Sequence, residues 1–303
     1  MKIELHPPLS IYEIGKRQKQ EDAIAQWDNR LFILCDGMGG HAMGEVASQG
    51  VCRSLTRWFE EHISPSAPLT DDHLREALEC AYTELDQYAD SSRQMGTTLT
   101  LLYINRCGVT AAHIGDSRIY HIRPNVGLLY QSRDHSLAFD LFQAGEITYA
   151  EMLNYPRKNI ITRAMTPGKD NRARPDIIHI TDIKPDDWFF LCSDGMMEQM
   201  TNADLMAVFC ADLPDKEKMQ QLRLATIQHY DNHSAWLLHV KSVTREEGDE
   251  ALINEELTAR CNALLILPKA DEHDVTIVKE GAKGNTVVQK MKTLLKSVIN
   301  IKK

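Results

Sequence analysis

One stretch of this chain, residues 31–48 with the sequence LFILCDGMGGHAMGEVAS, constrains both the fold and the chemistry. The apolar run at residues 31–35 is bounded by turn residues and predicts a buried strand. Asp36 stands where that run stops, and the glycines after it let the backbone approach another group closely or adopt a positive φ. From about Gly44, apolar residues recur with helical spacing. A carboxylate beside a bare glycine loop suits a hard metal ion, since Mg²⁺ and Mn²⁺ prefer oxygen ligands. The simpler alternative is that Asp36 only caps the helix.

Composition narrows the class of protein. The chain has 303 residues, 43% of them apolar, which is enough for one large domain or two small ones. Its net charge of −9 argues against a general nucleic-acid binder, which needs a basic face. Seven cysteines without a CxxC pair indicate reduced thiols and a cytoplasmic protein. We expect no signal peptide and no membrane span, because no run approaches the roughly 18 apolar residues that a span needs.

The chain up to residue 240 alternates between helical and extended patterns. A second helix is predicted from about Thr70, and residues 96–132 read as four short strands of an antiparallel meander. Residues 134–175 mix helix and loop and, inserted between strands, suit a lid over a site. The later predicted elements are a strand at 188–192, helices near 202–211 and 215–229, and a strand at 235–240.

Acidic residues recur at the edges of these strands and in the turns between them. Besides Asp36 they are Glu21, Asp22, Asp116, Asp194 and Asp231. Each alone has a simple explanation as a solvated charge or a turn former. If the sheets bring the strand ends together, however, several carboxylates share one pocket and cannot all stay ionised there without cations. The pattern therefore predicts the two-metal site of a hydrolase.

Eight motifs in order give a more specific indication. They are RQKQEDA, LFILCDGMGGHAMGEVAS, MGTTLTLL, AHIGDSRIY, RDHSLA, NIITRAM, LCSDGM and HYDNHSA. Together they cover about residues 10–240 and resemble the protein phosphatase 2C family of metal-dependent Ser/Thr phosphatases, in its compact bacterial form. The resemblance implies an α+β fold, a four-layer α-β-β-α sandwich of two antiparallel sheets flanked by helices, with the metal pocket at one end. It also implies a catalytic domain at 1–240 with a lid at about 136–175, leaving 241–303 as a C-terminal extension.

The resemblance assigns roles to individual residues. Asp36 bridges two Mg²⁺ or Mn²⁺ ions, Asp194 and Asp231 hold one of them, and the Gly37 carbonyl holds the other. Glu21 lies near that second ion, Asp22 lies behind it or holds one of its waters, and Asp116 with Asp194 binds a third, weaker ion. Arg17 binds the substrate phosphate, a role that suits the fork geometry of a guanidinium.

Two positions depart from the family pattern or leave a choice. Met38 stands where many eukaryotic relatives carry the histidine proposed as general acid, and a thioether cannot donate a proton. His41 is the nearest substitute, with a metal-bound water as the alternative and a loop-ordering hydrogen bond as the simpler role of His41. Asp274 also lies in a sequence like the closing motif. We assign that motif to Asp231 because Asn232 follows it and because its distance from Asp194 suits compact relatives.

The function implied by the resemblance is hydrolysis of phosphoserine and phosphothreonine in proteins. A water that bridges the metals attacks phosphorus directly, so no cysteine need act as a nucleophile, and Cys35 and Cys192 are expected in the core. The expected partners are phosphoproteins that a Ser/Thr kinase has modified, with no nucleic acid, and the chain is expected to be a monomer. Two alternatives are an inactive scaffold of the same fold and a metal-dependent phosphodiesterase or nuclease. The basic amphipathic end of the extension either packs on the catalytic domain or docks a partner or a membrane surface.

Overall fold

The computed structural model describes residues 1–39, 43–64, 69–88, 95–156, 160–169, 172–198, 200–245 and 248–249. The chain divides into two compact units, residues 1–249 and 250–303, and every described residue belongs to the first. The basic amphipathic end of the extension, together with Asp274, lies outside the described residues. So does His41.

Two antiparallel sheets form the centre of the first unit. One contains β1 (Lys2–Leu5), β2 (Leu9–Glu13), β8 (Arg118–Arg123), β9 (Gly127–Gln131), β11 (Trp188–Cys192) and β12 (His233–Thr244), in the order β1-β12-β11-β8-β9 with β2 also paired to β12. The other contains β3 (Asp22–Trp27), β4 (Leu31–Gly39), β5 (Met95–Thr97), β6 (Leu99–Asn105), β7 (Gly108–Ile114) and β10 (Asp176–Ile180), in the order β10-β7-β6-β4-β3 with β5 paired to β4. We call these the β11 sheet and the β4 sheet.

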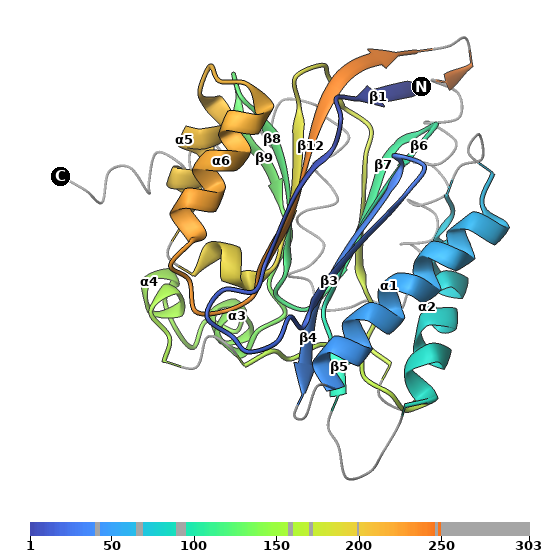
Figure 1. Ribbon diagram of the computed structural model, residues 1–303, viewed down its shortest axis with the longest axis vertical. Coiled ribbons are helices and arrows are strands. Elements are labelled where there is room, and N and C mark those ends of the chain that lie inside the picture. Colours follow the sequence, from blue (N-terminus) through green and yellow to red (C-terminus); the bar gives the residue numbers. More distant parts are fainter. Residues whose placement is uncertain are drawn as a thin grey trace. The chain divides into compact units, whose positions relative to one another are not determined.

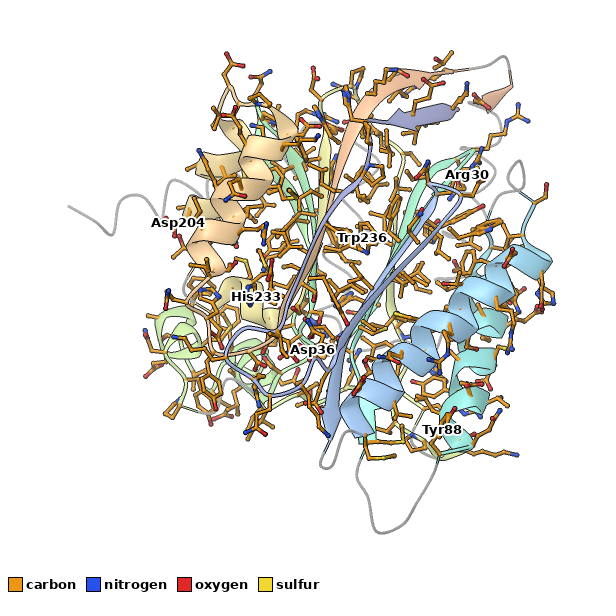
Figure 2. All side chains as sticks on the ribbon, viewed as in Figure 1. Arg30, Asp36, Tyr88, Asp204, His233 and Trp236 are labelled. Carbon is orange, nitrogen blue, oxygen red and sulfur yellow. The ribbon has the colours of Figure 1, made fainter. Side chains whose placement is uncertain are left out.

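The two sheets stack face to face because their central strands are apolar on both sides. In β4, Phe32 and Leu34 face the β11 sheet, where they join Phe189 and Leu191 in one buried cluster. Alternate residues of the same strands point to the outer layers instead, as side chains in a strand must. Trp236 of β12 lies between the sheets in Figure 2, and its indole nitrogen donates to the Ile33 carbonyl at 3.0 Å.

Helices cover the outer face of each sheet (Figure 1). α1 (Met43–His62) and α2 (Asp71–Asp86) pack on the β4 sheet, and α5 (Asn202–Cys210) and α6 (Asp215–Thr226) pack on the β11 sheet. α2 begins where the sequence predicts, because the Thr70 hydroxyl caps it by accepting from the His73 amide at 3.1 Å. The predicted four-layer α-β-β-α sandwich is therefore confirmed.

One prediction about the strands was wrong in detail. Residues 96–132 do not form a single meander, because β6 and β7 pair in the β4 sheet while β8 and β9 pair in the β11 sheet. The chain crosses between the sheets at residues 115–117. Gly115 has φ +106° there, and a Cβ on it would lie 2.6 Å from the Thr98 side chain. The crossing places Asp116 between the two sheets rather than in an ordinary hairpin turn.

The predicted lid region contains two short helices, α3 (Leu137–Gln143) and α4 (Tyr149–Leu153). Its role as a lid stays a prediction. Cys35 and Cys192 are fully buried, as expected for core residues, and the six cysteines among the described residues are all free thiols. In the described part of the chain, no helix is long and apolar enough to cross a membrane.

Candidate metal centre

The predicted acidic residues meet at one end of the two sheets. β3 and β4 pair so that Asp22 lies directly opposite Asp36, and Asp194 begins the 3₁₀ turn η2 (Asp194–Met197) immediately after β11. Figure 2 shows Asp36 of β4 and His233 of β12 at this same end, and Asp231 comes two residues before His233. Asp36 does not stand at the end of its strand as expected, since β4 continues to Gly39 and pairs with β5 there.

Hydroxyl groups hold the Asp22 carboxylate and the Asp36 backbone in place. The Ser193 hydroxyl donates to Asp22 Oδ2 at 2.9 Å and accepts from the Ser234 amide at 3.0 Å. It therefore ties the start of β3 to β11 and β12 in the other sheet. On the β4 side, the Asp36 amide donates to the Thr98 hydroxyl at 2.9 Å, and the Thr98 amide donates back to the Asp36 carbonyl at 2.8 Å. Sequence reasoning gave no role in the site to Ser193 or Thr98, although each lies within a motif that it identified.

Burial and mutual repulsion raise the pKa values of these carboxyls. Burial, with the charges of Asp194 and Asp231, raises the pKa of Asp22 to about 7, although the hydrogen bond from Ser193 acts to lower it. Burial and the Asp194 charge raise the pKa of Asp116 to about 8. The pKa of Asp36 is raised well above its usual range, by burial first and then by the four other aspartates. The pKa of Asp194 is also raised, by burial and by Asp231. Each charge acts on the others because the groups share one pocket.

The pocket has the properties of a divalent-cation site. Asp22 Oδ1 and Asp116 Oδ1 are each buried without a hydrogen-bond partner among the described residues, which is costly unless a cation or a water lies beside each oxygen. All the candidate donors are oxygens, the type that Mg²⁺ and Mn²⁺ prefer. The residues present therefore fit the predicted ions, whose positive charge would offset the repulsion among the carboxylates.

Two glycines expose further oxygens beside the aspartates. A Cβ on Gly44 would lie 2.9 Å from both the Gly37 carbonyl oxygen and Glu21 Oε1, so these two oxygens approach the same point. A Cβ on Gly37 would lie only 2.2 Å from the Gly44 carbonyl. Burial raises the pKa of Glu21. The start of α1 thus packs against β4 closely enough to present Gly37 and Glu21 together, but only while both positions are glycine.

Arg17 and Asp231 are in direct contact. Arg17 Nε lies 2.8 Å from Asp231 Oδ1, and Nη2 lies 2.7 Å from Oδ2, a two-point ion pair that raises the pKa of the arginine. The buried Asn232 holds this loop, because its side-chain amide donates to the carbonyls of Ile14 and Lys19 at 2.8 and 2.9 Å. The residues predicted to bind phosphate and metal are therefore neighbours, and a cation at Asp231 must compete with Arg17.

A histidine network that sequence reasoning missed supports the Asp116 turn. His135 Nδ1 accepts from the Gly115 amide at 3.1 Å, and its Nε2 lies 3.3 Å from Asp176 Oδ2. The His113 ring stacks on His135 with centroids 4.7 Å apart. The signal available in the sequence was His135 itself, inside the RDHSLA motif. His135 therefore supports the turn that carries Asp116, because its Nδ1 is already bonded to the Gly115 amide.

Comparisons with known proteins agree with this geometry. The family model described as Protein phosphatase 2C matches residues 13–229. Protein phosphatase PhpP of Streptococcus pneumoniae is 33% identical over 220 residues, which cover 68% of this chain and 85% of the relative. The crystal structure of serine/threonine phosphatase Stp1 from Staphylococcus aureus matches with a TM-score of 0.70 and 28% identity, over 80% of this chain and 96% of that one. The catalytic domain of serine threonine protein phosphatase PstP, in complex with two manganese ions, matches with a TM-score of 0.64 and 25% identity, over 78% of this chain and 99% of that domain.

Proposed function

The chain belongs to the protein phosphatase 2C family and is a protein-serine/threonine phosphatase, and on this premise we propose that the acidic pocket is its active site. The observation that carries the proposal is the meeting of five aspartates from both sheets at one point, with buried oxygens that lack partners among the described residues. The family is metal-dependent, and we propose two Mn²⁺ or Mg²⁺ ions at Asp36, Gly37, Asp194 and Asp231, with Glu21 and Asp22 close by. Asp116 and Asp194 are the proposed donors to a third ion.

The ions, when bound, acidify a water for attack on phosphorus and neutralise charge on the phosphoryl oxygens. The chain's own residues supply position and charge. Asp36 lies at the centre, because its carboxyl is influenced by Asp22, Asp116, Asp194 and Asp231 together. The Ser193 and Thr98 hydrogen bonds fix the acids before substrate arrives, so no reorganisation is needed at the moment of reaction.

Arg17 is the proposed phosphate ligand. Its side chain is 45% exposed, and its fork donates two parallel hydrogen bonds to an anion, the Asp231 carboxylate. A phosphate can take the same donors. We propose that a phosphorylated serine or threonine of a protein, the product of a Ser/Thr kinase, is the group that Arg17 orients.

No covalent phosphoenzyme is needed. Burial raises the pKa values of the thiols of Cys35 and Cys192 far above their usual range, so neither forms a thiolate at neutral pH. Met38, beside the pocket, has no proton to donate. The general acid is therefore His41 or a water, as the sequence predicts. The inactive-scaffold alternative is disfavoured because each proposed ligand position retains its oxygen donor.

The test is phosphate release from a phosphothreonine peptide with Mn²⁺ and with EDTA, for wild type and Asp194→Asn. We expect activity that requires metal and falls at least a hundredfold in the variant. Asp186→Asn is the matched control, because that side chain is 82% exposed and its φ of +68° is one that asparagine tolerates. No release from a folded wild-type protein with either Mn²⁺ or Mg²⁺ would establish the scaffold instead.

A further inference from the structure

A basic groove, defined by Met38, residues 161–164, Thr166 and residues 172–174, encloses a cavity of about 680 Å³. Strands β4 and β5 link it to the acidic pocket. Gly37 pairs with Thr97 of β5, and Thr97 exchanges two backbone hydrogen bonds with Met165 at 2.9 and 2.8 Å. The groove therefore begins two residues from Asp36, at Met38.

Close packing at one glycine brings the walls of the basic groove together. A Cβ on Gly96 would lie 3.0 Å from the Thr166 methyl group and 3.5 Å from Met38 Cγ. Met38 and Thr166 therefore meet over β5. A protein segment whose phosphorylated residue reaches the acidic pocket has this groove as an adjoining surface for its neighbouring residues.

Three arginines line the groove, and two of them are occupied. Arg163 Nη1 lies 3.1 Å from Asp176 Oδ1. Arg172 pairs with Glu79 and with Asp86, the latter at 3.0 Å, and its guanidinium lies over the Tyr82 ring. Arg174 is exposed, and no carboxylate in the described part of the chain pairs with it. In a protein with a net charge of −9, an exposed arginine in a groove beside the proposed active site suits the recognition of an anion.

We propose that Arg174 is a specificity residue that binds an anionic side chain, a carboxylate or a second phosphate, near the phosphorylated residue of the substrate. The inference rests on the proposed function and adds a substrate class to it, namely phosphoproteins with acidic residues around the phosphorylation site. Arg174 acts on substrate binding and not on the chemical step, because it lines the basic groove and is not among the aspartates of the acidic pocket. Its loss raises KM for acidic substrates and leaves kcat nearly unchanged.

The experiment compares kcat/KM for wild type, Arg174→Ala and Arg174→Glu on three phosphothreonine peptides that differ only in the flanking residues. One peptide has neutral flanks, one has aspartate or glutamate, and one has a second phosphate as non-hydrolysed phosphonate. The small ester p-nitrophenyl phosphate, which has no flanking residues, reports the chemical step alone. Arg57→Ala is the control, because Arg57 is likewise exposed and without a carboxylate partner among the described residues, but lies on α1 outside this groove.

We expect Arg174→Ala to lower kcat/KM by about fivefold or more for an anionic peptide, the effect of losing one charged hydrogen-bonded contact. Activity on the neutral peptide and on p-nitrophenyl phosphate should remain within twofold, and Arg174→Glu should disfavour anionic flanks further. Loss for only the carboxylate or only the phosphonate peptide identifies which anion is bound. Equal preference among the peptides in wild type and both variants would overturn the inference while leaving the proposed function intact. Absence of activity on every ester in wild type would instead refute the proposed function.

Discussion

Replacing Asp22 by asparagine should stabilise the metal-free protein. Asp22 is fully buried, one of its oxygens has no partner within the described residues, and its pKa rises from 3.8 to about 7 on folding. Such a rise corresponds to about 4 kcal/mol of destabilisation at pH 8, where the carboxylate is ionised in both states. Asparagine has nearly the same shape and can still accept the hydrogen bond from Ser193. An unsatisfied amide N–H offsets about 1 kcal/mol of the gain.

The stability gained by Asp22→Asn should increase as pH rises. Between about pH 4 and pH 7 the folded protein keeps the proton on Asp22 and the unfolded chain does not, so the folded state binds more protons and wild-type stability falls as pH rises. Asparagine does not titrate. The free-energy difference between Asp22→Asn and wild type should therefore grow by about 4 kcal/mol from pH 4 to pH 8. For a unit of this size, a gain of about 3 kcal/mol raises Tm by about 6–12 °C.

Urea unfolding in EDTA across this pH range measures the difference directly. The other aspartates are present in both proteins, so subtracting the two curves leaves the titration of Asp22 together with its effect on Asp36, whose pKa the Asp22 charge raises. Asp186→Asn makes the same chemical change at an exposed position and should show no pH-dependent gain. A difference between Asp22→Asn and wild type that stays constant from pH 4 to pH 8 would refute the idea that a buried charge strains this pocket.

Two further substitutions test the packing around the site and the far end of the β11 sheet. Gly37→Ala should lower the equilibrium constants for folding and for Mn²⁺ binding by tenfold or more, because the new Cβ would lie 2.2 Å from the Gly44 carbonyl. The control Gly50→Ala, whose Cβ meets only ordinary contacts, should be neutral or gain up to about 1 kcal/mol of stability. Urea unfolding measures the stability of each variant, and calorimetry measures its Mn²⁺ affinity. Asp187→Ala should cost about 3–5 kcal/mol of stability at pH 7, because the fully buried Asp187 carboxylate accepts hydrogen bonds from Arg123 at 2.6 and 2.8 Å. Burial raises the pKa of Asp187, but these bonds outweigh it and hold the pKa to about 2. The cost should therefore shrink as pH falls from 4 to 2 in the same unfolding assay, and a cost that does not depend on pH would contradict the assignment.

The strands were predictable because burial on both faces leaves a plain signal in the sequence. β11 occupies residues 188–192 as predicted, since an uninterrupted apolar run of that length fits a strand enclosed between another sheet and helices. Sheet membership was not predictable in the same way. β7 and β8 are separated by three residues, yet they belong to different sheets, because distant partners, β10 for β7 and β11 for β8, help to decide where each strand lies. Local pattern contains no information on such partners.

The acids of the site were predictable for a related reason. A carboxylate at the end of an apolar strand has few structural roles. When several such carboxylates occur in one chain, a shared site becomes the simplest explanation. The groups that orient them could not be identified, because Ser193 and Asp22 are 171 residues apart and their hydrogen bond depends on how the two sheets stack. Serine and threonine near an acid are too common in sequences to indicate such a bond.

The contact between Arg17 and Asp231 is another pairing that the sequence did not predict, and it lies in the proposed active site. Sequence reasoning gave these residues separate partners, a phosphate and a metal, whereas in the structure the guanidinium and the carboxylate form a two-point ion pair with each other. They lie 214 positions apart, and Asn232 brings their loops together by bonding to Ile14 and Lys19. With the proposed roles, a cation at Asp231 and a phosphate at Arg17 do not bind to independent sites, because each must displace one partner of this ion pair.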